Sequence, residues 1–108
     1  MKTYHARTFG NVFVLEDGKR RVLPPRLDLV NHSPDGFGWG YGGSGPAQLA
    51  LAIIADVYDD ETALFYYQRF KAEHIAAQIR DAPFHMTLDQ VLAAVEGLRA
   101  SQPQEQPR

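Results

Sequence analysis

The longest apolar run of the chain lies near its centre. Residues 46–55 read PAQLALAIIA and contain no charged side chain. Alanine and leucine are strong helix formers, and proline is tolerated at the first helical position. The pattern therefore predicts a helix from Pro46 to about Tyr58. Ser44 or Gly45 is its expected N-terminal cap. The apolar residues lie on every face of this helix, which is typical of a helix surrounded by the rest of its domain.

The N-terminal quarter has the composition of short β-strands. Three segments are rich in the aromatic and β-branched residues that suit a half-buried sheet: residues 2–8, 11–15 and 20–23. Asp17-Gly18 tolerates the positive φ angles of a tight hairpin, so the last two segments should pair. Pro24-Pro25 should end the third strand because proline has no amide donor. We predict a small antiparallel sheet of about three strands, with residues 84–86 as the candidate fourth.

Two further helices are expected after the central one. Between residues 61 and 80, apolar side chains recur at helical spacing, and acidic residues stand at the start, where the helix dipole favours them. The tetrapeptide TLDQ at residues 87–90 matches a capping box and predicts a helix that runs to about Ala100. Strands followed by three helices, the first of them buried, predict one α+β domain over residues 1–100. The polar, proline-containing segment 101–108 predicts a disordered tail.

Charge is segregated along the chain, although the net charge is only −2. Residues 1–27 carry a balance of +4, and residues 28–62 carry a balance of −6 without a single lysine or arginine. Such blocks bear on partners rather than on the fold. Each block could meet a partner of opposite sign, or the two could meet each other.

Composition narrows the classes of function. The chain has 108 residues and no cysteine, which excludes disulfides, thiolate metal sites and cysteine catalysis. No apolar run reaches the roughly 18 residues of a membrane span, and the N-terminus lacks the apolar core of a secretory signal. We therefore expect a cytoplasmic protein that does not enter a membrane.

A glycine-rich segment precedes the central helix. Residues 36–45 contain six glycines, with aromatic residues at alternate positions between them: Phe37, Trp39 and Tyr41. The spacing G-x-G-x-x-G occurs here, and a helix N-terminus attracts anions. However, no parallel strand–turn–helix–strand unit surrounds it, as a dinucleotide site requires. Our interpretation is a backbone that packs closely while the aromatic rings fill the core. A small anion- or nucleotide-binding module stays open as an alternative.

The sequence contains no convincing catalytic or metal-binding pattern. Ser44 lies between glycines, but the final glycine of a nucleophile elbow is missing. The four histidines share no ligand spacing: His5, His32, His74 and His85. We therefore predict a protein that is not an enzyme and uses no metal or cofactor.

Two groups of residues are candidates for binding. The first combines the acidic middle of the chain with an aromatic helix face: Asp56, Asp59, Asp60, Glu61, Phe65 and Tyr66. Aromatic residues cover more than one face of that helix, so Phe65 or Tyr66 should stay exposed, and exposed aromatic rings mark interfaces. The second group is basic and could neutralise nucleic-acid phosphates: Lys19, Arg20, Arg21 and Arg26.

The central segment also resembles a known signature. Arg26–Leu29, Asn31–Pro34 and the string from Gly36 to Ala50 resemble the pattern NHSPxGFxWGYGGSGPAQLALA of a small uncharacterised family found in bacteria, phages and other mobile elements. The resemblance extends over most of the chain up to Arg80. It departs at Gly38, where a larger residue, often glutamate, is expected. The family has no established activity, so the resemblance implies no catalytic residue.

The resemblance implies a biological context. Small mobile-element proteins of this kind often bind a host component, and some inhibit host defence, including anti-CRISPR proteins. We therefore expect a non-enzymatic protein that binds a host protein or nucleoprotein complex, in its sharpest form an anti-defence inhibitor. A nucleic-acid-binding accessory protein is the alternative, and a homodimer is compatible with either.

Overall fold

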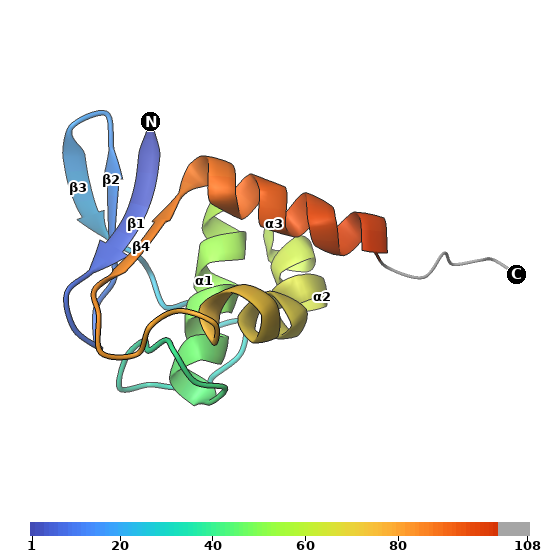
Figure 1. Ribbon diagram of the computed structural model, residues 1–108, viewed down its shortest axis with the longest axis horizontal. Coiled ribbons are helices and arrows are strands. Elements are labelled where there is room, and N and C mark those ends of the chain that lie inside the picture. Colours follow the sequence, from blue (N-terminus) through green and yellow to red (C-terminus); the bar gives the residue numbers. More distant parts are fainter. Residues whose placement is uncertain (102–108) are drawn as a thin grey trace, which may run out of the picture.

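The sheet is built around the first strand of the chain. In the computed structural model, which describes residues 1–101, four antiparallel strands follow the order β3-β2-β1-β4 (Figure 1). Their bounds are Lys2–Ala6 for β1, Phe13–Glu16 for β2, Lys19–Val22 for β3 and Phe84–Thr87 for β4. The predicted α+β class and the fourth strand are confirmed. β4 comes from a distant part of the chain and pairs with the free edge of β1.

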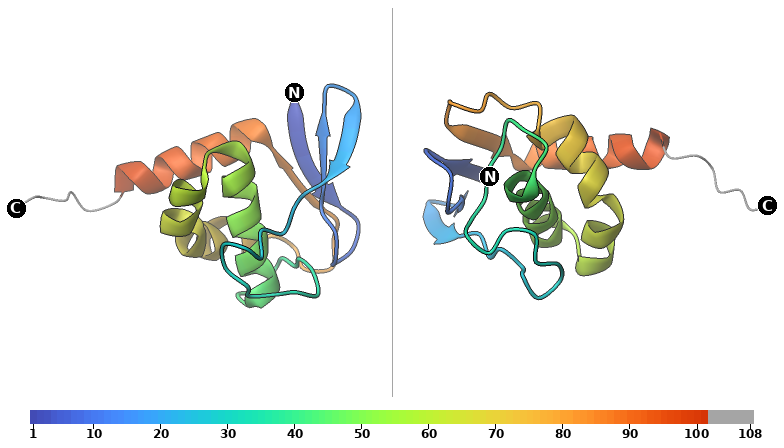
Figure 2. Two further views of the ribbon diagram at one scale, coloured as in Figure 1. Left: turned by 180° about the vertical axis from the view of Figure 1, so that it is seen from behind. Right: turned by 90° about the horizontal axis from the view of Figure 1, so that it is seen from below.

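The two faces of the sheet have different surroundings. Burial alternates along β1 and β4, so that Tyr4, Ala6, Phe84 and Met86 are buried and the residues between them are not. All the helices lie on one side of the sheet, as both views in Figure 2 show. The alternating residues therefore either enter the core or line an outer face that no helix covers.

The hairpin between β2 and β3 forms as its turn sequence predicts. Glu16 pairs with Lys19, which leaves only Asp17 and Gly18 in the loop. Both have positive φ, 54° and 80°, as a two-residue turn of this hand requires.

Helix α1, Ser44–Val57, is the buried centre of the molecule. Every residue from Gly45 to Ile54 is buried, which confirms the prediction of a helix enclosed on all sides. The helix begins earlier than predicted. Gly43 is the cap residue and no side chain caps the helix, so the expectation for Ser44 was wrong. Pro46 still causes no conflict, because the first-turn amides of a helix have no partner within it.

The predicted continuous helix over residues 61–80 is shorter and ends in a different geometry. Helix α2 runs over Asp60–Phe70 and continues into a π-helical turn, η1, over Lys71–Ile75. The amide of Ala76 donates to the carbonyl of Lys71, five residues back, at 2.8 Å. The carbonyl of Ile75 accepts from Gly40 at 3.0 Å, so the glycine-rich loop docks where the helix stops.

Helix α3, Leu88–Ser101, closes the domain against α1 and α2. The predicted capping box is present: the amide of Gln90 donates to the Thr87 hydroxyl at 3.1 Å, and the amide of Thr87 donates to the Gln90 side chain at 2.8 Å. Val91, Val95 and Leu98 are buried on its inner face. The predicted tail, apart from Ser101 at the end of the helix, lies outside the described residues.

Within residues 1–101, no helix is both long enough and apolar enough to cross a membrane.

Candidate functional site

The acidic and basic blocks of the sequence meet at Asp56, in the last turn of α1. The Tyr4 hydroxyl donates to Oδ2 of Asp56 at 2.6 Å, and Lys2 Nζ lies 3.2 Å from the same oxygen. Arg21, on β3, contacts both carboxylate oxygens at 2.9 and 3.1 Å. The Asp56 side chain is 14% exposed. One carboxylate therefore ties the first and third strands to the central helix.

Charge and burial act against each other at this carboxylate. Burial alone would raise the pKa of Asp56, but the hydrogen bonds from Tyr4, Arg21 and Lys2 together hold that pKa below its usual value. The pKa of Tyr4 shifts upward, because its hydroxyl is buried and donates to a carboxylate. Asp56 therefore stays ionised at neutral pH, and Tyr4 stays protonated.

A second cluster joins the two blocks at Arg26. Its guanidinium donates to both oxygens of Asp28 at 3.0 Å and to both oxygens of Asp60 at 2.9 and 3.0 Å. These paired hydrogen bonds raise the pKa of Arg26. The contact connects the loop after β3 to the first residue of α2. Much of the basic block and much of the acidic block therefore pair with each other within the fold.

The remaining acidic candidates have separate environments. Asp59 caps α2, because its Oδ1 accepts a hydrogen bond of 2.8 Å from the amide of Thr62. That contact lowers the pKa of the Asp59 carboxyl. Glu61 is exposed and forms no ion pair within the described residues. Of the predicted acidic group, only Glu61 therefore keeps its charge free for a partner.

One exposed face of α2 carries two apolar side chains between two polar ones. We call it the α2 face, and it consists of Glu61, Leu64, Phe65 and Gln68. Phe65 is 64% exposed and Leu64 is 45% exposed. Tyr66 is half-buried, and its ring meets that of Phe65 edge-on at 4.8 Å between centroids. The expectation that one of the two aromatic rings stays off the core is confirmed.

The glycine-rich loop packs tightly over the start of α1. A Cβ at Gly45 would lie 2.9 Å from the amide nitrogen of Gly38, and one at Gly43 would lie 2.5 Å from the ring of Tyr41. Phe37 and Trp39 are buried, as expected, and Trp39 Nε1 donates to the carbonyl of Ala82 at 2.9 Å. Tyr41 stays half-buried and covers glycine. Gly43 and Gly45 thus serve close packing beside the first turn of α1.

Gln48 organises the loop before the glycines, from inside the core. Its side-chain oxygen accepts from the amides of His32 and Ser33 at 2.8 and 3.1 Å, and its side-chain nitrogen donates to the carbonyls of Pro25 and Val30 at 2.6 and 3.0 Å. Four buried hydrogen bonds from one amide explain why a polar residue interrupts the apolar helix.

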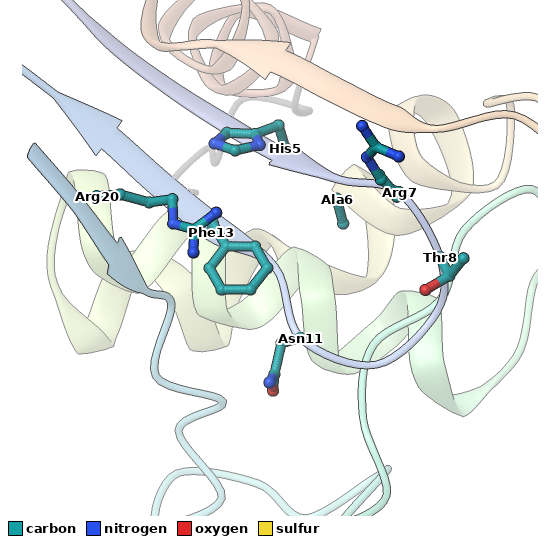
Figure 3. Close-up of a pocket in the computed structure, with 7 residues that line it drawn as sticks. All are labelled: His5, Ala6, Arg7, Thr8, Asn11, Phe13 and Arg20. Carbon is teal, nitrogen blue, oxygen red and sulfur yellow. The ribbon is translucent and has the colours of Figure 1, made fainter. Parts of the chain in front are cut away.

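Some of the basic candidates are held in ion pairs and others are left exposed, as is true of the acidic candidates. Arg21 and Arg26 are held in the two ion-pair clusters. Lys19 and Arg20 are exposed, and the Arg20 guanidinium lies over the ring of Phe13 at 4.5 Å. Arg7, which no sequence motif marks, lines the same cavity as Arg20 on the sheet side of the molecule (Figure 3). The pairing of β2 with both β1 and β3 brings the two arginines to one cavity, so no local motif could have shown it.

Comparison with known proteins gives a family but no activity. No curated protein matches the sequence, and neither does any solved structure. The model of a family of unknown function, DUF6166, matches residues 4–97. That match extends over the sheet, the glycine-rich loop and all three helices, and agrees with the resemblance to an uncharacterised family. The chain therefore belongs to the DUF6166 family of proteins of unknown function.

Proposed function

We propose that this protein acts by binding another protein through the α2 face. The observation that carries the proposal is the exposure of Phe65 and Leu64, next to each other on a helix that packs into the core through Ala63 and Phe70. Adjacent exposed aromatic and aliphatic side chains are typical of interface centres, where aromatic anchors contribute most of the binding energy.

The surroundings of Phe65 define the chemistry of its partner. Glu61 stands one helical turn before Phe65 on the same face. Gln68 follows close by, so the apolar centre has polar residues on either side, as protein interfaces do. The matching surface is an apolar pocket with at least one basic side chain at its rim. Asp56, Asp59 and Asp60 are left out of the proposed contact, because each carboxylate is engaged in hydrogen bonds within the fold.

The resemblance to mobile-element proteins supplies the context of the proposal. In that context the partner is a host protein or nucleoprotein complex, and the sharpest form of the proposal is an inhibitor of host defence. A basic rim around the partner's pocket fits a protein that handles nucleic acid. The α2 face would then compete for that surface without catalysing a reaction.

Site-specific crosslinking tests the proposal directly. A photoreactive phenylalanine analogue at position 65 should crosslink one host protein in a saturable manner. In a separate pull-down without the crosslinker, Phe65→Ser should abolish capture of that host protein. The matched control is Ile79→Ser, which changes an apolar side chain that is 74% exposed but lies outside α2. Equal losses in both variants, or crosslinking only between copies of this chain, would reject a foreign partner at this face.

A functional assay tests the sharper form. Expression of the protein in a host with an active defence system should raise phage or plasmid survival, and Phe65→Ser should remove that effect. Unchanged survival with the crosslinked partner still present would leave protein binding in place and reject defence inhibition.

A further inference from the structure

A cavity of about 380 Å³ lies between the end of β1 and the β2–β3 hairpin. Figure 3 shows its lining, with Arg20 and Phe13 on one side and Arg7 and Thr8 on the other. His5 and Asn11 complete its polar wall. No carboxylate lines this cavity, in contrast to the two ion-pair clusters that hold Asp56 and Asp60.

The two guanidinium groups of the cavity carry free positive charge. Within residues 1–101, neither Arg7 nor Arg20 forms an ion pair, and both are exposed. Arg20 is held in place by the ring of Phe13 beneath it. Guanidinium groups on such a support present several N–H donors in a fixed plane, a geometry that matches phosphate oxygens.

His5 adds a second, independent sign of a ligand. Its Nε2 atom is buried and has no hydrogen-bond partner within the described residues. A buried polar atom without a partner is unfavourable, and native structures contain few of them. Thr8 and Asn11 bring a hydroxyl and an amide to the same cavity. An anion with several acceptor oxygens would satisfy the donors of Arg7, Arg20, Thr8 and Asn11 together, and also Nε2 of His5 in the tautomer that carries its proton there.

Two neighbouring hollows share lining residues with the cavity. One of about 270 Å³ shares Arg7 and Thr8 and adds Phe9 and Arg80. The other shares Arg20 and adds Lys19. Arg80 lies over the ring of Tyr41 at 4.7 Å. We call the resulting series the arginine row, and it consists of Arg20, Arg7 and Arg80. The outer hollows also contain carboxylates, from Asp81 on one side and from Glu16 and Asp17 on the other, so the acid-free central cavity is the strongest anion site of the row.

An exposed aromatic ring accompanies the arginine row. Phe9 is 42% exposed and meets Trp39 edge-on at 4.9 Å, so its position is fixed by the core. Bases stack on such rings in single strands, whereas the bases of a duplex are already stacked on each other. A row of guanidinium groups beside an aromatic platform is the arrangement that single-strand-binding proteins use.

We propose that the arginine row binds single-stranded nucleic acid, with one phosphate in the cavity formed by His5, Arg7 and Arg20. This site shares Arg20 with the basic hairpin considered from the sequence and adds Arg7 and Arg80, whereas Arg21 and Arg26 are held in ion pairs and do not take part. It also lies apart from α2, so it adds a second ligand to the proposed protein partner.

Fluorescence anisotropy with a labelled 12-nucleotide single strand, as DNA and as RNA, tests the proposal. One phosphate in the central cavity and one at Arg80 predict a salt slope of about −1.4, which is about a sevenfold loss of affinity between 50 and 200 mM salt. Arg7→Gln and Arg20→Gln should each weaken binding about eightfold at 50 mM salt and reduce the slope by about 0.7. Phe65→Ser should leave this binding unchanged, which separates it from the proposed protein interface.

Two controls distinguish a binding role from a structural one. Arg69→Gln makes the same charge change on α2, where Arg69 is similarly accessible, and should not affect binding. His5→Phe keeps an aromatic ring but removes the nitrogen atoms, so it should weaken binding without lowering the melting temperature. An equal loss in Arg69→Gln, or no saturable binding at 50 mM salt, would overturn the proposal. So would a duplex of the same length binding as tightly as the single strand, or a mononucleotide binding as tightly as the 12-mer.

Discussion

The hydroxyl of Tyr4, on β1, donates a hydrogen bond of 2.6 Å to the carboxylate of Asp56, at the end of α1. Tyr4 is completely buried, so its hydroxyl has no access to water and depends on this acceptor. Arg21 reaches the same carboxylate from β3. The contact thus closes the sheet onto the central helix and uses one acidic and one basic residue that the sequence had offered as binding groups.

Removal of the Asp56 carboxylate should destabilise the protein strongly. Asp56→Ala leaves the buried Tyr4 hydroxyl without an acceptor, and we expect the free energy of unfolding to fall by about 3 kcal/mol. Tyr4→Phe leaves the carboxylate with Arg21 and Lys2, so its cost should be smaller, about 1 kcal/mol. Urea unfolding measures both, with the exposed Asp35→Asn as control. A loss below about 0.5 kcal/mol for Asp56→Ala would contradict a structural role for the contact.

The same carboxylate should make stability depend on acid pH. Its pKa in the folded state lies below its usual value, because three hydrogen bonds outweigh the effect of burial. A lowered folded pKa contributes stability above the unfolded pKa of about 3.9, and this contribution disappears as pH falls through the folded pKa. The stability difference between wild type and Asp56→Asn should therefore be constant from pH 7 to about 5 and shrink below about pH 4. Urea unfolding over this pH range measures it, and a difference that grows toward low pH would show the opposite shift.

Local signals were sufficient for much of the fold. Asp17-Gly18 fixes its hairpin through positive φ, and the Thr87–Gln90 capping box fixes the start of α3, because each depends only on neighbouring residues. The buried central helix was equally predictable, since its apolar residues cover all its faces. The prediction failed where a contact with a distant segment of the chain accompanies the end of an element. The helix after Asp59 passes into a π-helical turn that ends at Ile75, whose carbonyl accepts from the amides of Gly40 and Gln78, and nothing near Ile75 in the sequence indicates the contact with Gly40.

The candidate site depends even more on distant pairing. Composition showed two opposite charge blocks but not which residues would pair, so Asp56 and Arg26 looked as available as Glu61 and Arg20. Their partners come from strands and loops far away along the chain. Conversely, Arg7 stands alone in the sequence and becomes a candidate only when the sheet brings it to the cavity it shares with Arg20. Sequence patterns give the least information about single residues whose partners lie far away along the chain.

Gly40 and Gly97 should respond in opposite ways to the same substitution. Gly40 has φ of +81°, and a Cβ there would lie 2.4 Å from the Cα of Arg80, so the loop could not dock on the end of η1. We expect Gly40→Ala to lower the free energy of unfolding by about 3 kcal/mol, from backbone strain and steric overlap together. Gly97 lies exposed within α3 with open space around it, and Gly97→Ala should raise stability by about 0.5 to 1 kcal/mol, because alanine favours the helix.

Urea unfolding of both alanine variants, with circular dichroism as the probe, checks this pair. The comparison is matched because each variant adds one methyl group, so a different sign can arise only from the local backbone and its neighbours. A Gly40→Ala protein as stable as wild type would mean that the loop does not rest on Arg80. The docking of the glycine-rich loop on the last turn of η1, and with it the reason that the helix stops there, would then be wrong.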